Sequence, residues 1–341
     1  MKFTSLLVVC AILTIGTLPQ STPATQTAES TYSTFAQWCL NRNSLTQDAQ
    51  TTVQALLTVA ETTDCDRASQ ILASSESLML DGYQIRDLRS LASLTQLHSL
   101  SLEGNQISDI TPLASLKNLT GLSLNSNQVS SLEPLASLTK LATLQLSSNQ
   151  IQDLRPLASL TNLWLLLIDN NQIRELNPLA SLVKLHSLDV SNNDKIYDLR
   201  PLQGLTNLYK LFAQDNQITD LSSLQSLSSL TLLELGGNEI SDLRPLKSLS
   251  VGYLRLSDNR IEDLQPLRSL TDLKELDLSQ NRITDITSLS SLQELFSLNL
   301  SGNLISDLQP LKPLNNLTQL NLMDNPLHNP ICPVRDEVCR F

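Results

Sequence analysis

The chain has 341 residues, of which 4% are aromatic and 17% charged, and its formal net charge at pH 7 is −11. An acidic protein binds nucleic acid or an anionic membrane only through a local basic patch, and the sequence contains no run of Lys or Arg that would form one. We therefore predict no nucleic-acid partner and no anionic membrane partner.

The chain begins with a segment typical of export signals. Lys2 precedes an apolar run from Leu6 to Ile15, and a stretch rich in Ser, Thr, Ala and Pro follows it. We predict a signal peptide over residues 1–24, cut after Ala24 with Ala28 as second choice, and a flexible segment over residues 25–36.

Two membrane-bound alternatives are less favoured. Lipid attachment to Cys10 would need a small residue before it, whereas Val9 stands there and the apolar run continues past it. The run is also shorter than the roughly 20 residues that span a bilayer. We therefore predict an exported protein, periplasmic or extracellular, without a stable membrane anchor.

Residues 37–75 are predicted to form a helical N-terminal cap. Ser44 with Gln47 has the spacing of a capping box, and the following apolar residues recur at helical spacing. These apolar residues are Val53, Leu56, Leu57 and Ala60. One helix is thus expected between Cys39 and Cys65.

Residues 76–327 repeat the pattern L-x-x-L-x-L-x-x-N-x-I-x-D-L-x-P in about twelve turns. An Asn recurs every 22 residues, except for one step of 23 after Asn193 and one of 21 after Asn238. An earlier turn carries Tyr83 in the Asn place. We name these residues the Asn ladder: Asn105, Asn127, Asn149, Asn171, Asn193, Asn216, Asn238, Asn259, Asn281, Asn303 and Asn325.

The residue types of the repeat each have a mechanical reason. The L-x-L segment alternates with period two and predicts a short strand with one buried face, so stacked turns form a parallel sheet. The Asn amide both donates and accepts, which satisfies backbone groups where the chain bends inward. Pro suits the first position of a short 3₁₀ turn on the returning side. These prolines are Pro112, Pro134, Pro156, Pro178, Pro201, Pro245, Pro266 and Pro310, with Ser at 90, 223 and 288.

The repeat resembles the 22-residue leucine-rich class of bacterial internalins and of the leucine-rich regulatory subunit of protein phosphatase 1. The resemblance implies an α/β solenoid: a right-handed leucine-rich-repeat arc with a parallel sheet on the concave face and a 3₁₀ or extended convex side. It also implies binding by the concave face, without naming a partner.

Residues 328–341 are predicted to close the end of the solenoid as a C-terminal cap. After removal of Cys10 four cysteines remain, and local pairs Cys39 to Cys65 and Cys332 to Cys339 are the most economical of three pairings in an exported protein. Metal binding by Cys332, Cys339 and His328 is disfavoured by spacing. The ending Asn-Pro-Leu, Ile-Cys-Pro and Cys-Arg-Phe resembles exported cyanobacterial leucine-rich proteins, and we expect no further domain after it.

The sequence offers little for catalysis. Its three His, at 98, 186 and 328, have no nearby Ser or Cys arrangement of nucleophilic type. A carboxylate recurs with the repeat at Asp87, Asp109, Asp153, Glu175, Asp198, Asp220, Asp242, Asp263, Asp285 and Asp307. We interpret the series as acceptors for amides of the following turn rather than as a calcium ladder, because the Gly-rich calcium-binding nonapeptide is absent. We predict no enzyme activity, no cofactor and no metal.

Function is expected where the repeat does not dictate the residue. Outward positions of the predicted strands are mostly small and polar, but large side chains interrupt them in the middle of the solenoid. We name these residues the central patch: Trp164, Leu165, Leu167, Tyr209, Lys210, Phe212, Leu232 and Tyr253. Exposed aromatics beside charges are typical of a binding hot spot, although Trp164 and Tyr209 could instead cover the edge of the core.

Three functions remain open at this point. The favoured one is adhesin-like binding of a protein or cell-surface glycan by the concave face. A secreted inhibitor that occludes a hydrolase is the second. Control of a phosphatase would require residence in the cytosol, against which the signal peptide argues. The oligomeric state is not predicted.

Overall fold

The computed structural model describes residues 32–193, 195–328 and 330–341. The predicted signal peptide and Cys10 lie outside these ranges, as does most of the segment 25–36. Within them, no helix is long and apolar enough to cross a bilayer.

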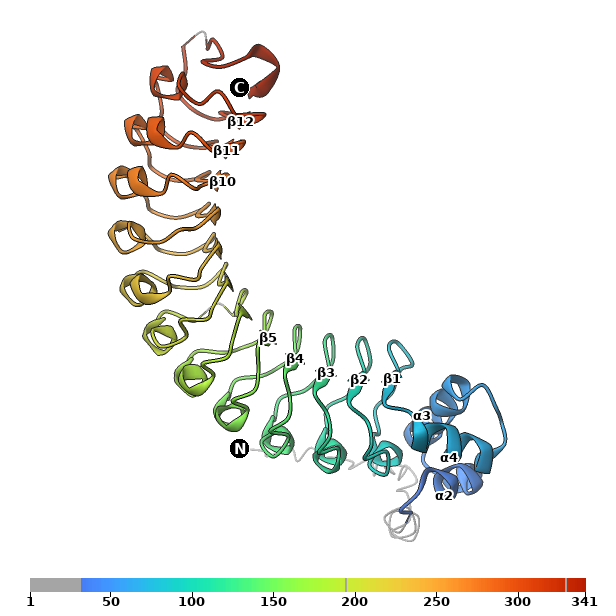
Figure 1. Cartoon of the computed structure of the whole chain (residues 1–341). Coiled ribbons are helices and arrows are strands. Elements are labelled where there is room, and N and C mark those ends of the chain that lie inside the picture. Colours follow the sequence, from blue (N-terminus) through green and yellow to red (C-terminus); the bar gives the residue numbers. More distant parts are fainter. Residues whose placement is uncertain (1–31, 194, 329) are drawn as a thin grey trace, which may run out of the picture.

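The described chain forms an open arc in which the strands line the concave side and 3₁₀ helices line the convex side (Figure 1). The strands form one parallel sheet in chain order: β1 Ser77–Met79, β2 Ser99–Ser101, β3 Gly121–Ser123, β4 Thr143–Gln145, β5 Leu165–Leu167, β6 Ser187–Asp189, β7 Lys210–Phe212, β8 Leu232–Glu234, β9 Tyr253–Arg255, β10 Glu275–Asp277, β11 Ser297–Asn299, β12 Gln319–Asn321 and β13 Cys339–Arg340. The predicted solenoid class is confirmed.

The 3₁₀ helices return the chain from one strand to the next. They are η2 Arg89–Leu91, η3 Thr111–Ser115, η4 Glu133–Leu135, η5 Arg155–Ser159, η6 Asn177–Ser181, η7 Arg200–Leu202, η8 Ser222–Ser226, η9 Arg244–Leu246, η10 Gln265–Ser269, η11 Thr287–Ser291 and η12 Gln309–Leu311. Each predicted proline is the second residue of its 3₁₀ helix rather than the first. The second residue also has no helical acceptor for an N–H, so the same reason holds at that position.

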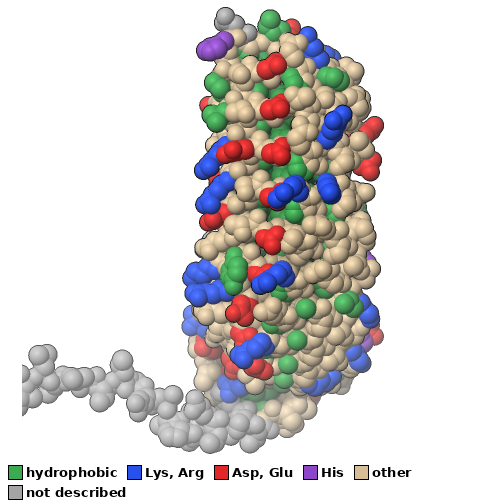
Figure 2. Space-filling view, turned by 90° about the vertical axis from the view of Figure 1, so that its left-hand side faces the viewer, with side chains coloured by type: hydrophobic (Ala, Val, Ile, Leu, Met, Phe, Trp, Pro, Cys, Tyr) green, Lys and Arg blue, Asp and Glu red, His purple; other side chains and the backbone are tan. Residues whose placement is uncertain are grey.

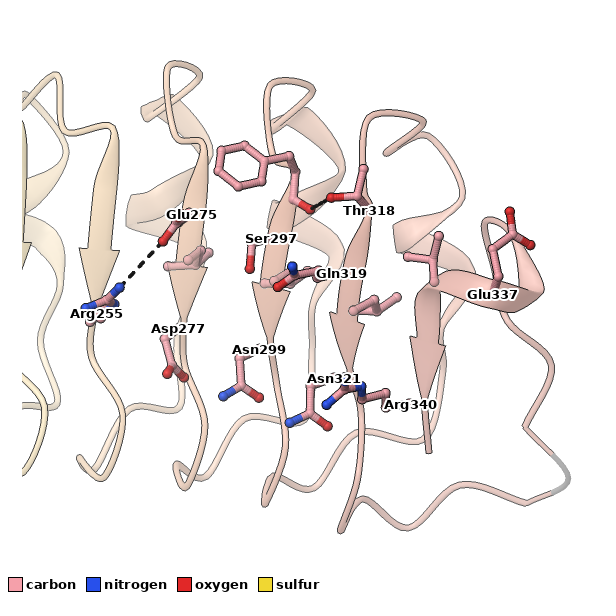
Figure 3. Close-up of a pocket in the computed structure, with 15 residues that line it drawn as sticks. Arg255, Glu275, Asp277, Ser297, Asn299, Thr318, Gln319, Asn321, Glu337 and Arg340 are labelled. Carbon is pink, nitrogen blue, oxygen red and sulfur yellow. Dashed lines mark hydrogen bonds and ion pairs between the residues drawn. The ribbon is translucent and has the colours of Figure 1, made fainter.

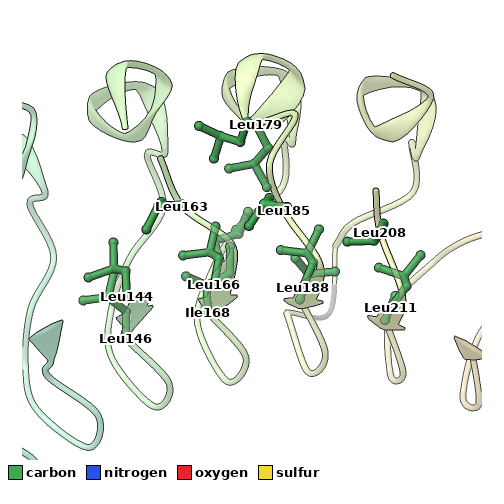
Figure 4. Packing of buried hydrophobic residues seen from close by; sticks show 14 of the residues in the cluster. Leu144, Leu146, Leu163, Leu166, Ile168, Leu179, Leu185, Leu188, Leu208 and Leu211 are labelled. Carbon is green, nitrogen blue, oxygen red and sulfur yellow. The ribbon is translucent and has the colours of Figure 1, made fainter. Parts of the chain in front are cut away.

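The core is a stack of leucine layers, one per turn. The middle residue of each three-residue strand points inward, and the two outer residues face the concave surface. Figure 4 shows how Leu144, Leu166 and Leu188 follow one another on successive strands and pack against leucines of the returning segments. All three are fully buried. Each layer therefore contacts its neighbours in the stack, and the terminal layers need caps.

The Asn ladder satisfies the backbone where the strands end. The Asn149 Nδ2 atom donates to the carbonyls of Leu124 at 2.9 Å and Leu146 at 3.1 Å, and its Oδ1 atom accepts from the Val129 N–H at 2.9 Å. The Leu146 carbonyl also accepts from the next ladder residue, Asn171, at 2.9 Å. Each strand-end carbonyl from Leu102 to Leu300 is thus shared by two ladder residues, which links the turns into a continuous network.

The residue before each ladder position has a left-handed backbone. The twelve residues concerned are Gly82, Gly104, Ser126, Ser148, Asn170, Asn192, Asp215, Gly237, Asp258, Gln280, Gly302 and Asp324, with φ between 51° and 73°. Gly, Asn and Asp, which tolerate this conformation best, fill nine of these places. The sharp turn that presents the Asn amide to the interior therefore begins at this residue.

The repeated carboxylates lie at the start of the convex 3₁₀ helices. Nine of the ten predicted residues accept a backbone N–H two residues later at 2.8–2.9 Å. Four also form ion pairs with Arg two residues on, as in Asp153 with Arg155. Figure 2 shows acidic side chains in file along this side. Side-chain hydrogen bonds from Arg155 lower the pKa of Asp153.

The N-terminal cap has three α-helices, α2 Phe35–Leu40, α3 Gln47–Val59 and α4 Cys65–Ser74. The helix predicted between Cys39 and Cys65 is confirmed as α3, and the two cysteines themselves lie on the flanking helices α2 and α4. The predicted capping box was wrong: Thr46 caps α3, while the Ser44 hydroxyl donates to the Asn41 carbonyl at 2.8 Å. The reason is that Ser44 ends a preceding 3₁₀ turn, Arg42–Ser44.

Both predicted disulfides are present, and each closes one end of the solenoid. Cys39–Cys65 joins α2 to α4, and the apolar face of α3 is buried as predicted. Cys332–Cys339 ties β13 back to the chain, so β13 adds a thirteenth strand beside β12. Val338, 5% exposed, covers the last leucine layer there. The cap therefore continues the sheet as well as shielding the core.

Candidate binding surface

The central patch lies on the concave face over β5 to β9. The strand register forms two rows of outward side chains across β5, β6 and β7. The first row is Leu165, Ser187 and Lys210, and the second is Leu167, Asp189 and Phe212. Leu232 of β8 and Tyr253 of β9 continue the first of these rows. The structure therefore places all five strand-borne apolar residues of the patch on one continuous surface.

Trp164 and Tyr209 lie just before their strands rather than on them, at the edge of the sheet. Each is 46% exposed, so neither serves mainly to cover the core. The backbone links them through His186, whose N–H donates to the Trp164 carbonyl and whose own carbonyl accepts from Tyr209 N–H, both at 2.8 Å. His186 is exposed and was missed, although it occupies the same repeat position as the two aromatics.

A polar network crosses the C-terminal part of the patch. Glu234 is buried at 8% exposure, accepts from Gln214 Nε2 at 2.7 Å and pairs with Arg255 Nη1 at 2.5 Å. Arg255 also lies 3.6 Å from Glu275. The charge of Glu234 is thus satisfied within the protein, which leaves the carboxylates nearer β5 and β6 for other contacts.

Comparisons with known proteins agree with this architecture. A family model for leucine-rich repeats in two copies matches residues 117–159 and 253–291. An internalin from Listeria monocytogenes, InlF, is 32% identical with a TM-score of 0.76, over 85% of this chain and 94% of that one. The chain belongs to the internalin-like leucine-rich-repeat proteins.

Two further structures are similar to this internalin-like chain. Internalin C2 of Listeria monocytogenes is 36% identical with a TM-score of 0.55, over 59% of this chain and 91% of that one. The ectodomain of the Arabidopsis thaliana receptor kinase GASSHO1/SCHENGEN3, solved in complex with CASPARIAN STRIP INTEGRITY FACTOR 2, shares the fold at 23% identity and a TM-score of 0.61, over 70% of this chain and 31% of that one. No curated protein sequence matches the chain.

Asp189 is a carboxylate on the concave face of this internalin-like protein whose pKa is shifted by its surroundings. It is half-buried on β6 between Leu167 and Phe212 on the flanking strands, and its Oδ1 atom accepts from the Ser191 N–H at 3.0 Å. Burial raises its pKa, and the nearby charges of Asp169 and Glu234 raise it further, while hydrogen bonds from Ser191 act the other way. Among the described residues no cation lies within ion-pair distance of Asp189.

The described residues bring no three His, Cys, Asp or Glu side chains into a group that could hold a metal ion. Cys332 and Cys339 are joined to each other. The internalin-like fold is typically a binding scaffold without enzyme activity. The exposed central patch on the concave face is therefore the candidate surface for recognition.

Proposed function

We propose that the protein is an exported, non-enzymatic recognition protein of adhesin-like type that binds a protein partner through its central patch. The observation that carries the proposal is the group of large, partly exposed side chains on β5, β7, β8 and β9, four of the five consecutive strands from β5 to β9. At about 4.8 Å per strand, these strands span roughly 20 Å along the arc, which suits the centre of a protein interface.

The make-up of the patch favours a protein partner. Trp, Tyr and Phe supply large rigid contact areas, and binding energy concentrates in such residues when a polar rim surrounds them. The rim here includes Asp169, whose two oxygens accept from Ser147 and Asn170, and the paired Glu234 and Arg255. This arrangement provides both an apolar centre and fixed polar groups.

The charge of the patch specifies the partner further. Asp189 lies between two apolar side chains and carries no internal ion pair within the described chain, so a Lys or Arg of the partner would both neutralise it and pack its aliphatic stem on Leu167 and Phe212. The partner surface is therefore expected to present a basic side chain among apolar ones.

Export is supported by the two disulfides, which form and persist in oxidising compartments. The internalin-like relatives point the same way, toward an extracellular or surface location. The amino-terminal sequence features described above supply the export signal in this proposal.

The test is affinity capture from a cell-surface protein fraction with the disulfide-bonded protein as bait. Replacing Trp164, Phe212 and Tyr253 by Ala should lower binding of the captured protein at least about 100-fold, since hot-spot residues each contribute about 2 kcal/mol or more. The melting temperature should fall only slightly, because none of the three is in the core.

A matched control replaces three exposed apolar residues off the patch, Met79, Tyr197 and Leu304, by Ala; they are 68%, 60% and 55% exposed. This variant should bind as the wild type does. Equal loss in both variants, or a large fall in stability of the patch variant, would contradict the proposal. Capture of a soluble hydrolase in place of a surface protein would favour the inhibitor alternative.

A further inference from the structure

The concave face is hollowed at its C-terminal end, next to the β9 edge of the central patch. The hollow has a volume of 540 Å³ and is lined by outward residues of β9 to β12 and by the C-terminal cap. Figure 3 shows that the C-terminal cap borders the hollow beyond β12, with Arg340 next to Asn321 and Glu337 at the far end. This volume is within the range of about 300–1,000 Å³ typical of small-ligand sites.

Polar side chains line the floor of the hollow in two rows. Strand register places Asp277, Asn299, Asn321 and Arg340 in one row, with one residue on each of four adjacent strands. Glu275, Ser297 and Gln319 form the parallel row on β10 to β12. Within a row the side chains therefore repeat at about 4.8 Å, the spacing of the strands.

The hydrogen bonds that these side chains already make fix which atoms face the hollow. The Asn299 Oδ1 atom accepts from the Ser301 N–H at 3.2 Å, and the Asn321 Oδ1 atom accepts from the Met323 N–H at 3.3 Å. Because a backbone N–H can only donate, the amide oxygens must face it. The two Nδ2 groups then remain as donors without a partner among the described residues.

The neighbouring groups in the row complete a pattern of acceptor and donors. Asp277 uses Oδ1 for the Ser279 N–H and hydroxyl at 2.9 and 2.6 Å, so Oδ2 remains available as an acceptor. Within the described chain the Arg340 guanidinium and the Gln319 amide have no hydrogen-bond partner. An acceptor at one end is therefore followed by three donors along the row.

We propose that this hollow is a binding site for an uncharged oligosaccharide. Sugar hydroxyl groups both donate and accept, so a ligand with hydroxyls along its length can pair with the Asp277 carboxylate and with the amides and guanidinium beside it. Phe296, which is 36% exposed and lines the hollow, offers an apolar surface to the C–H face of a sugar ring.

The charges of the hollow favour a neutral glycan over an acidic one. Its lining holds three carboxylates, Glu275, Asp277 and Glu337, and two guanidiniums, Arg255 and Arg340, which leaves one excess negative charge. Arg255 is already engaged by Glu234 and Glu275. A sulfated or carboxylated sugar would therefore meet a surface without a surplus of positive charge.

The experiment is binding of the full chain to an array of neutral oligosaccharides, followed by calorimetric titration of the best ligand. The key variant is Asn299→Asp with Asn321→Asp, which keeps Oδ1 for the backbone and replaces each free donor by an acceptor. We expect the Kd to rise at least tenfold, while the melting temperature stays close to that of the wild type.

The matched control is Gln145→Glu on β4, which makes the same chemical change at the same strand position outside the hollow. It should bind the glycan as the wild type does, and so should a variant with only Trp164 and Phe212 of the central patch replaced by Ala, since neither residue lines the hollow. The two proposals can therefore fail independently: loss of protein binding tests the central patch, and loss of glycan binding tests the hollow. Absence of neutral-glycan binding, or binding unchanged in the double variant, overturns the proposal.

Discussion

The two sides of each strand obey different rules in this protein. The middle residue of β2 to β12 is Leu in every case and is at most 2% exposed, whereas the outward residues range from Gly and Ser to Phe and Arg. The inward side is repeated because each layer must match the next, and a change there affects the stack. The outward side does not have to match a neighbouring layer, so its residues differ from turn to turn.

The largest expected loss of stability comes from a substitution in the interior, Asn149→Ala. In Asn149→Ala the Val129 N–H loses its acceptor and three further hydrogen bonds disappear, although the Leu124 and Leu146 carbonyls keep a second ladder Asn each. One orphaned buried N–H and the lost bonds together should cost about 3 kcal/mol of unfolding free energy.

Chemical denaturation followed by circular dichroism measures this cost, and hydrogen exchange locates it on β4 and β5. Gln150→Ala, exposed and next to Asn149, is the control and should change stability by less than about 0.5 kcal/mol. A loss below about 1 kcal/mol in Asn149→Ala would show that water replaces the amide and that the ladder is not a stabilising network.

A smaller effect is expected where the chain turns toward the ladder. Gly104 has φ +67°, and a Cβ added there would meet no atom closer than 4.0 Å, so Gly104→Ala costs only the left-handed backbone, about 1 kcal/mol. A Cβ added to Gly204 would have no atom within 4 Å, and the φ of Gly204 is ordinary. Gly204→Ala should therefore be neutral or slightly stabilising, and equal effects of the two substitutions in thermal melts would refute the role of the turn.

The repeated part of the fold could be predicted from the sequence because each position is selected by the same physical requirement many times. Leu spacing indicated the strands, Asn spacing the strand ends, and the recurring Asp the start of the convex turns. The left-handed position also leaves a signal, since Gly, Asn and Asp concentrate before the ladder residue, but the leucine and asparagine spacing alone does not reveal it.

The caps were predicted less well because each occurs once. Ser44 and Thr46 are both good capping residues, and only the packing of the preceding 3₁₀ turn decides that Thr46 caps α3. Likewise, pairing of Cys339 and Arg340 with β12 depends on where the last disulfide holds the chain. The hollow that this strand closes could not be inferred from spacing.

The smallest predicted effect comes from Asp189, on the outward side of β6. Replacing it should stabilise the protein, whereas replacing Asn149 should destabilise it. Burial raises the pKa of Asp189, so the folded state binds this proton more tightly than the unfolded state does. The ionised carboxylate therefore destabilises the fold at neutral pH, and the cost disappears as pH falls from the raised pKa toward the unfolded value of about 3.9.

Asp189→Asn keeps an oxygen for the Ser191 N–H and removes the charge. We expect a gain in unfolding free energy of less than about 1 kcal/mol at pH 7, shrinking toward zero near pH 4, measured by denaturant titration at both values. A lower unfolding free energy of Asp189→Asn than of the wild type at pH 7 would refute the claim that the ionised carboxylate destabilises the fold. If the captured partner contributes a basic side chain, the same substitution should weaken its binding. The ionised Asp189 destabilises the free protein, and an ion pair with a Lys or Arg of the partner would make its charge favourable in the complex.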